Sequence, residues 1–267
     1  MNHLLRSHAP ITDSAWELLD SEARGRLKAA LAARKVVDFA GPYGWEHSAT
    51  NLGRVEAVPA GPVEGVTGLR RQVLPLVELR ADFAIPFAEL RDHDRGRPDV
   101  DLGPLDEAAH QIADAENIAV FHGWTDAGIV GMAEASPHKA LALSKAPEKY
   151  PRAVATAVEL LLQTGVDGPF ALALGRDEYT RVIETAEYGG YLLLDHLRKI
   201  LDGPVIWAPG VNGAIVVSLR GGDFQFDSGQ DLAIGYDHHD AEAVYFYLEE
   251  SFSFLAVTPE AAVPLTP

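Results

Sequence analysis

The chain has 267 residues, with 22 Lys and Arg against 39 Asp and Glu, and its net charge is −17 with histidine neutral. This excess of acids argues against a nucleic-acid partner, because phosphate contacts need clustered cations, and an anionic membrane is disfavoured for the same reason. The chain has no cysteine, which excludes disulfides, thiol nucleophiles and thiolate metal sites.

Hydrophobic residues make up 47% of the chain and charged residues 23%, a composition typical of a globular protein with a sizeable core. No apolar run approaches the roughly 18 to 20 residues of a membrane-spanning helix. The first residues do not show the basic start and apolar stretch of a secretory signal. We therefore expect a soluble cytoplasmic protein.

The first predicted element is a helix that ends near Arg34 or Lys35. Ser14 and Glu17 have the spacing of a capping box, and Thr12 or Asp13 is an alternative cap. Apolar residues with a period of 3.6 then form one stripe that must be buried. The members of this stripe are Trp16, Leu19, Ala23, Leu27, Ala30 and Leu31.

A long strand is predicted over residues 77–87, where apolar and polar side chains alternate. It follows two stretches rich in Gly and Pro, and it is longer than the usual five or six residues. This pattern predicts an extended arm whose apolar face packs either on the chain's own core or on a partner subunit.

Helices and strands are mixed in the rest of the chain. Helical periods cover residues 105–119, 151–163, 177–185 and 191–201, and strands are predicted over residues 170–174, 205–207, 214–219, 223–227 and 244–257. Because the two kinds of element do not alternate with a regular βαβ period, the predicted class is α+β.

No catalytic, cofactor or metal site emerges from the motifs. The chain has no phosphate-binding loop, dinucleotide fingerprint, Gly-x-Ser-x-Gly elbow or zinc helix. His238 and His239 are interpreted as a solvated turn in preference to a metal site. Nine acids and no cation follow Arg220; they form either a solvated surface or a docking site for a basic partner.

Several strings resemble encapsulins, the shell proteins of bacterial nanocompartments, in the same order along nearly the whole chain. They are GPYGWEHSATNLG at 41–53, LPLVELRADFAI at 74–85, RGRPDVDL at 95–102, and RGGDFQFDSGQDLAIGYDHHDAEAVYFYLEESFSFLAVTPEA at 220–261. The resemblance implies the HK97-type fold of phage major capsid proteins. It assigns residues 1–44 to an N-terminal helix and arm, 45–88 to the E-loop, 89–136 and 223–267 to the P-domain, and 137–222 to the A-domain.

The resemblance also implies two sites. A groove on the inner wall binds the C-terminal targeting peptide of a cargo enzyme, and we expect it to have acidic margins that suit leucines, isoleucines and a lysine. The matching residues are Leu27, Ala30, Leu31, Arg34, Asp38, Asp231, Leu232, Ile234 and Tyr236. A five-fold pore would be lined by Glu184, Thr185, Ala186, Glu187, Tyr188, Gly189 and Gly190.

The function implied by the resemblance is a shell of about 60 copies without enzymatic activity. Its cargo is a dye-decolorising peroxidase or a ferritin-like protein, with roles in oxidative stress or iron storage. One alternative is a phage or prophage major capsid protein, although the early N-terminal helix suits cargo docking better. The other alternative, a bacteriocin or protease-like enzyme, lacks an identifiable nucleophile, base and orienting group.

Overall fold

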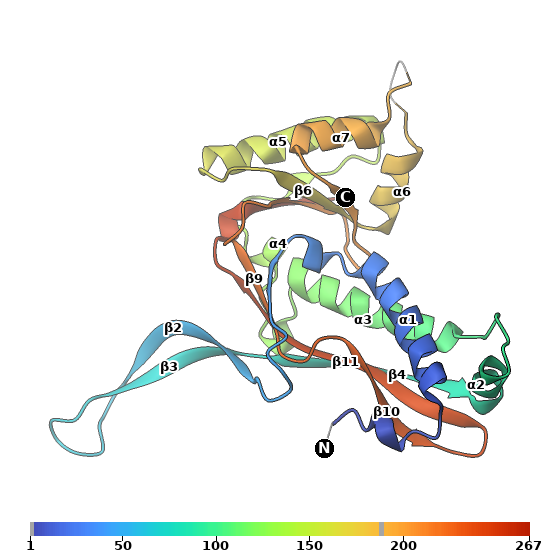
Figure 1. Cartoon of the computed structure of the whole chain (residues 1–267). Coiled ribbons are helices and arrows are strands. Elements are labelled where there is room, and N and C mark those ends of the chain that lie inside the picture. Colours follow the sequence, from blue (N-terminus) through green and yellow to red (C-terminus); the bar gives the residue numbers. More distant parts are fainter. Residues whose placement is uncertain (1–2, 187–189) are drawn as a thin grey trace.

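The computed structural model describes residues 3–186 and 190–267. Figure 1 shows a body built from two sheets with helices packed on them, and a two-stranded arm that projects away from the body. The α+β class predicted from the sequence is confirmed.

The first sheet has the order β1-β9-β11-β10, and β4 pairs with β11 along the edge opposite to β10. Its strands are β1 (Asp38–Ala40), β4 (Val77–Pro86), β9 (Phe224–Ser228), β10 (Ala233–His239) and β11 (Ala243–Ala256). β4 pairs with β11 from Val77 opposite Phe252 to Pro86 opposite Ala243. Leu79, Phe83 and Ile85 are buried. The strand predicted over residues 77–87 is therefore confirmed, and its apolar face packs on the chain's own core, which is one of the two alternatives; it belongs to the sheet and does not form an extended arm.

Two long helices, α1 (Asp13–Ala30) and α3 (Gly103–Phe121), lie over this sheet, as Figure 1 shows. Thr12 is the N-cap of α1, and its hydroxyl accepts a hydrogen bond from the Ala15 N–H. Trp16 then packs edge-on against Phe246 of β11, with ring centroids 5.4 Å apart. The predicted apolar stripe of the helix is buried, and Trp16 is its contact with β11.

The first helix ends at Ala30, four or five residues earlier than predicted, and Asn117 of α3 explains the difference. The Asn117 side-chain oxygen accepts hydrogen bonds from the Ala32 and Ala33 N–H groups, and its amide donates to the Ala30 carbonyl at 2.9 Å. These buried bonds satisfy backbone groups that a continuing helix would use itself. The segment after Ala30 turns into the short 3₁₀ helix η2 (Ala33–Lys35) instead.

The second sheet has the order β5-β12-β8-β6-β7. Its strands are β5 (Leu141–Ala142), β6 (Phe170–Leu174), β7 (Val205–Trp207), β8 (Ala214–Ser218) and β12 (Ala262–Thr266). The central strands β6 and β8 are buried along their whole length. The helices α5 (Tyr150–Gln163), α6 (Arg176–Glu184) and α7 (Leu193–Leu201) pack around this sheet (Figure 1). Each of these elements except β5 and β12 was predicted to within two residues.

The arm consists of β2 (Ala49–Val58) and β3 (Gly68–Pro75), which pair antiparallel. Figure 1 shows it extending sideways from the body. Several of its apolar side chains are exposed, and they are Val55, Val58, Val63, Val66, Leu69 and Val73. The extended arm that was predicted at residues 77–87 is thus formed instead by the two strands that precede β4.

The remaining short elements connect these parts. They are η1 (Arg6–His8), α2 (Phe87–Asp94), η3 (Thr125–Ala127), α4 (Met132–Ala135), η4 (Pro147–Lys149) and η5 (Pro259–Ala261). None of the helices in the described ranges is long and apolar enough to cross a membrane.

His238 and His239 are not in a turn, as was predicted, but end strand β10. His238 stacks on Tyr245, and a ring nitrogen of His239 shares a hydrogen bond of 2.6 Å with the Tyr236 hydroxyl. Each histidine therefore interacts with a tyrosine, and tertiary pairing with β11 extends the strand through both of them.

Candidate functional site

A groove of about 460 Å³ lies between α1 and strand β10. Its apolar surface comes from both walls, because Leu27 and Leu31 belong to the α1 side and Ile234 and Leu248 to the sheet. The full lining is Arg6, Asp20, Ala23, Arg24, Leu27, Lys28, Leu31, Arg34, Asp231, Leu232, Ala233, Ile234 and Leu248.

The α1 wall follows from the helical repeat. Ala23, Leu27 and Leu31 are four residues apart, so their side chains lie above one another on one face of the helix. At about 1.5 Å per residue, the wall from Asp20 to Leu31 is roughly 16 Å long. An extended peptide rises about 3.3 Å per residue, so the groove has room for about five residues of such a peptide.

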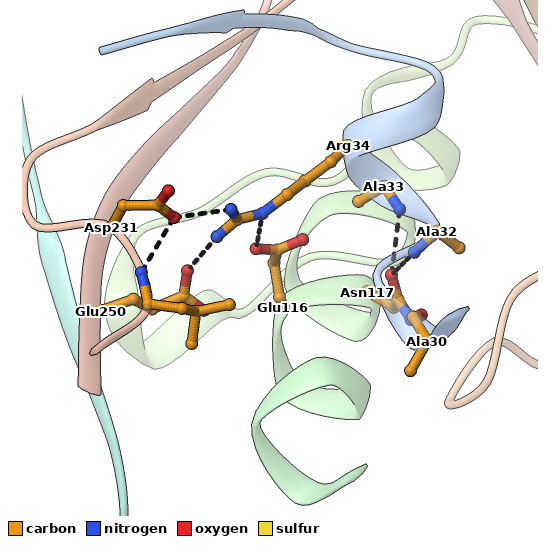
Figure 2. Close-up of polar contacts among 9 residues, drawn as sticks. Ala30, Ala32, Ala33, Arg34, Glu116, Asn117, Asp231 and Glu250 are labelled. Atoms are coloured by element: carbon orange, nitrogen blue, oxygen red, sulfur yellow. Dashed lines mark hydrogen bonds and ion pairs between the residues drawn. The ribbon is translucent and has the colours of Figure 1, made fainter. Parts of the chain in front are cut away.

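Arg34 lines the groove, and Figure 2 shows the carboxylates that surround its guanidinium. Its three guanidinium nitrogens each donate to a different carboxylate at 2.7 Å: Nε to Glu116, Nη1 to Asp231 and Nη2 to Glu250. The Glu116 and Glu250 side chains are 0% and 1% exposed, whereas that of Asp231 is 44% exposed. Arg34 therefore links the exposed carboxylate of Asp231 to the buried carboxylates of Glu116 and Glu250.

The three carboxylates around one guanidinium shift the ionisation of the cluster. Burial opposes the charge on Arg34, but the attraction of Glu116, Glu250 and Asp231 leaves its pKa raised. Burial also raises the pKa of Glu116, and it raises the pKa of Glu250 well above its usual value, with the nearby Glu116 charge adding to the effect. One cation does not balance three ionised acids, so Glu250 is the group that favours the protonated form.

The other charges of the groove contradict the acidic margins that were predicted. Among the described lining residues, four side chains are basic and only Asp20 and Asp231 are acidic. Arg6 is held by Asp20 through two hydrogen bonds of 2.9 and 2.7 Å. Arg24 and Lys28, one turn apart on α1, have no side-chain partner among the described residues and are exposed. Two unpaired cations thus face the groove from its helical wall.

Six of the nine residues expected to bind cargo line this groove: Leu27, Leu31, Arg34, Asp231, Leu232 and Ile234. The other three do not. Ala30 lines a different hollow, beside His110 and Trp207. The carboxylate of Asp38 accepts a hydrogen bond from the Gly222 N–H at 2.7 Å, and the buried Tyr236 bonds to His239.

The sequence reasoning missed the groove residues Arg6, Asp20, Ala23, Arg24, Lys28, Ala233 and Leu248. The helical repeat through Leu27 was a usable signal for Ala23, Arg24, Lys28 and Asp20, which lie three or four residues from one another along that face. Arg6 and Leu248 come from distant segments, and no local pattern indicated them.

The predicted pore segment is only partly described. Glu184 ends α6, Thr185 donates its hydroxyl to the Arg181 carbonyl at 2.6 Å, and Ala186 forms a β-bridge with Leu192. Gly190 has a positive φ of 79°, which favours glycine. Glu187, Tyr188 and Gly189 lie outside the described residues. Within the described ranges, no group of three His, Asp or Glu side chains is arranged to hold a metal ion.

Comparison of the sequence with known proteins identifies the family of this chain. The family described as encapsulating protein for peroxidase matches residues 1–253. A type 1 encapsulin shell protein of Rhodospirillum rubrum is 49% identical, with 99% of this chain and 96% of the relative covered. The chain belongs to the encapsulin shell protein family. Shell proteins of the same description from Brevibacterium linens and Mycobacterium tuberculosis are 43% and 41% identical over the full length of both chains.

Solved structures show the encapsulin fold to be that of capsids. The virus-like particle of Pyrococcus furiosus aligns with a TM-score of 0.65 at 19% identity, covering 92% of this chain and 97% of the other. The structure named Mycobacterium phage Bobi aligns with a TM-score of 0.56 at 10% identity, covering 89% and 90%. The HK97-type fold implied by the sequence resemblance to encapsulins is therefore confirmed, while the division into E-loop, P-domain and A-domain stays a prediction.

Proposed function

We propose that this encapsulin chain assembles with about 60 copies of itself into a closed icosahedral shell in the cytoplasm, and that the shell packages a cargo enzyme through its C-terminal peptide. The observation that carries the packaging proposal is the groove between α1 and β10, which combines an apolar floor with charged ends. Dye-decolorising peroxidases and ferritin-like proteins are the proposed cargo, which would link the shell to oxidative stress or iron storage.

The arm supports the assembly part of the proposal. Its exposed side chains include Val63 and Leu69, which are 65% and 66% exposed, and Figure 1 shows the β2–β3 arm projecting away from the body. Neighbouring exposed apolar side chains of this kind mark a surface that contacts another protein chain, here another copy of the same chain. Contacts between identical copies close into a shell when they repeat about several symmetry axes with the same geometry.

The groove supports the packaging part. Leu27 and Ile234 are 7% and 2% exposed, so they form a floor that extended leucine or isoleucine side chains can cover. Asp231 bonds to Arg34 and to the Leu232 N–H through the same oxygen, Oδ1. Its other oxygen is left for a lysine or arginine of the peptide, and Arg24 and Lys28 suit a carboxylate such as the chain terminus.

The segment from Glu184 to Gly190 is proposed to line a five-fold pore. Glu184 is exposed at the end of α6. Five copies of Glu184 or Glu187 around a narrow opening would raise the local concentration of cations. Replacing Glu187 by lysine is expected to slow metal-ion entry in a loaded shell, and an unchanged entry rate would remove this role.

The packaging test compares two substitutions of leucine by aspartate. Leu232→Asp places a charge on the half-buried groove wall, and Leu162→Asp places the same charge on the exposed face of α5, far from the groove. Ile234 is unsuitable because its burial makes an aspartate there a folding defect. Each variant is co-expressed with a dye-decolorising peroxidase and a ferritin-like protein from the same source. Loading must fall for the groove variant only; equal loading in intact shells would refute the proposal.

The two alternatives have weaker support. The phage structures and the capsid of a GTA particle are only 10–14% identical to this chain and so show the fold alone. The relatives at 41–49% identity are all named as shell proteins. This naming favours a structural shell over a phage capsid or an enzyme.

A further inference from the structure

Asn212 and Gly213 lie in the loop between β7 and β8 and form the chain's only Asn-Gly pair. The Asn212 side chain is exposed, and it forms no hydrogen bond within residues 3–186 and 190–267. The Gly213 N–H likewise donates no hydrogen bond in this part of the chain. An exposed carboxamide therefore lies next to a backbone amide that has no other bond and no side-chain bulk beside it.

The loop is held on both sides of this pair. The Asn212 N–H donates to Nε2 of His122 at 3.1 Å, and partial burial lowers the pKa of His122, which keeps the ring a neutral acceptor. The Gly213 carbonyl accepts the Gly175 N–H at 2.9 Å. Gly213 has a φ of 79°, and a Cβ there would collide with the Leu265 carbonyl oxygen. The Asn212 side chain is thus the part of this loop that is free to move.

This arrangement suits an intramolecular reaction of asparagine, the closure of a five-membered imide. The Gly213 nitrogen attacks Cγ of Asn212, the amide proton passes to hydroxide, and the Cγ–Nδ2 bond breaks as ammonia leaves with a proton from water. The resulting succinimide adds water at either carbonyl carbon and opens to an aspartate or an isoaspartate. The overall change consumes a water molecule, releases ammonia and adds a negative charge, without oxidation or reduction.

Asn212 also lines a hollow of about 350 Å³ in which cations outnumber acids. Lys145 and Arg176 are exposed and form no ion pair with any described residue, whereas Nη1 of Arg181 lies 3.7 Å from Oε1 of Glu178. Cations near a reacting amide stabilise the negative charge that develops on it, and also the carboxylate that results. The charged side chains of the lining are Lys145, Arg176, Asp177, Glu178 and Arg181. A carboxylate at position 212 would therefore equalise the number of cations and acids.

We propose that Asn212 is a site of self-modification, at which Gly213 closes a succinimide and water opens it to an acid, promoted by the cations of this hollow. The product places a carboxylate among Lys145, Arg176 and Arg181, and it adds to the net charge of −17. Because the reaction needs only water and hydroxide, it proceeds in the isolated protein. The modified fraction therefore increases with the age of the folded chain.

Isotope labelling tests the reaction at Asn212. The purified protein is kept at mildly alkaline pH in water labelled with heavy oxygen, and its tryptic peptides are followed by mass spectrometry. Asn212 lies in the peptide 200–220, and the control Asn51 lies in the peptide 36–54 of the same digest. Asn51 is also exposed, but the branched side chain of Leu52 hinders attack by the neighbouring backbone nitrogen.

The peptide 200–220 should gain heavy oxygen as a mixture of aspartate and isoaspartate, at least about tenfold faster than the peptide 36–54 gains it. Asn212→Gln should remove this gain, because its longer side chain would have to close a six-membered ring, which is slower. A peptide 200–220 that stays unlabelled, or one that is still labelled in Asn212→Gln, would overturn the proposal.

Lys145→Gln tests the contribution of the hollow. The matched control is Lys139→Gln, which removes the same charge from an exposed lysine that does not line the hollow. Label should appear roughly two- to threefold more slowly in Lys145→Gln, and more slowly still when Arg176→Gln is added, whereas Lys139→Gln should keep the rate of the parent. Equal rates in all these variants would show that the cations of the hollow do not promote the reaction and would overturn that part of the proposal.

Discussion

Removing Arg34 tests whether its ion pairs with Glu116, Asp231 and Glu250 stabilise the folded chain. Arg34→Met keeps much of the side-chain volume but deletes the cation that holds Glu116, Asp231 and Glu250. Asp231 is exposed enough for water to replace its bond, whereas Glu116 and Glu250 have almost no access to water. Leaving buried acids without their partner typically costs about 3–5 kcal/mol of folding free energy.

The matched control is Arg26→Met on α1, the helix that precedes the short η2 helix in which Arg34 lies. Arg26 is 47% exposed and pairs with Glu22 and Asp106, and the loss of an exposed pair changes stability little because water solvates the freed charges. Unfolding by urea is followed by tryptophan fluorescence at one fixed protein concentration, since assembly also contributes to stability. A further variant that adds Glu116→Gln and Glu250→Gln to Arg34→Met should recover part of the loss. Equal losses for Arg34→Met and Arg26→Met would refute the reasoning.

Three further results are expected. Glu250 binds its proton more tightly when folded, so the native protein loses stability as pH rises above the pKa of Glu250 in the unfolded chain. The stability advantage of Glu250→Gln over the parent should therefore grow as pH rises above that unfolded pKa, by about 1.4 kcal/mol per unit of difference between the folded and unfolded pKa, and a constant difference in urea midpoints would contradict this. Leu69→Asp on the arm should abolish particles in sedimentation while circular dichroism stays unchanged, whereas intact particles would exclude a role of that patch in assembly. About 60 copies of −17 give roughly −1,000 charges per shell, so raising salt to about 0.3 M should lower the concentration needed for assembly; the opposite salt effect in light scattering would show that attractive ion pairs dominate the contacts.

Most helices and strands were predictable because the spacing of apolar residues within each segment indicates its type. The helical repeat through Leu27 and the alternation through Phe83 each specify which face is buried. The end of α1 was not predictable in this way, since Asn117, which binds Ala30, Ala32 and Ala33, is far away in the sequence. Strand β4 was placed correctly along the chain, but its partner β11 is 157 to 175 residues distant, as Pro86 with Ala243 and Val77 with Phe252 show.

The groove was only partly predictable for the same reason. Resemblance to encapsulins indicated Leu31 and Ile234, which the structure brings together across the groove. It did not show that Arg34 is turned inward to two buried acids, or that Arg24 and Lys28 are left unpaired in the described structure. The nine acids that follow Arg220 suggested an acidic margin, yet Glu250 points to Arg34 in the interior and Asp227 is buried beside Thr50. Net charge in a segment therefore did not predict the charge of the surface it forms.

Electron microscopy of the purified chain tests the central claim most directly. The chain has a mass of 28.8 kDa, and the proposal requires that about 60 copies close around an empty interior. The expected result is a uniform population of hollow, closed particles tens of nanometres wide, on the order expected for such an assembly. A monomer or small oligomer under the same conditions would contradict the account.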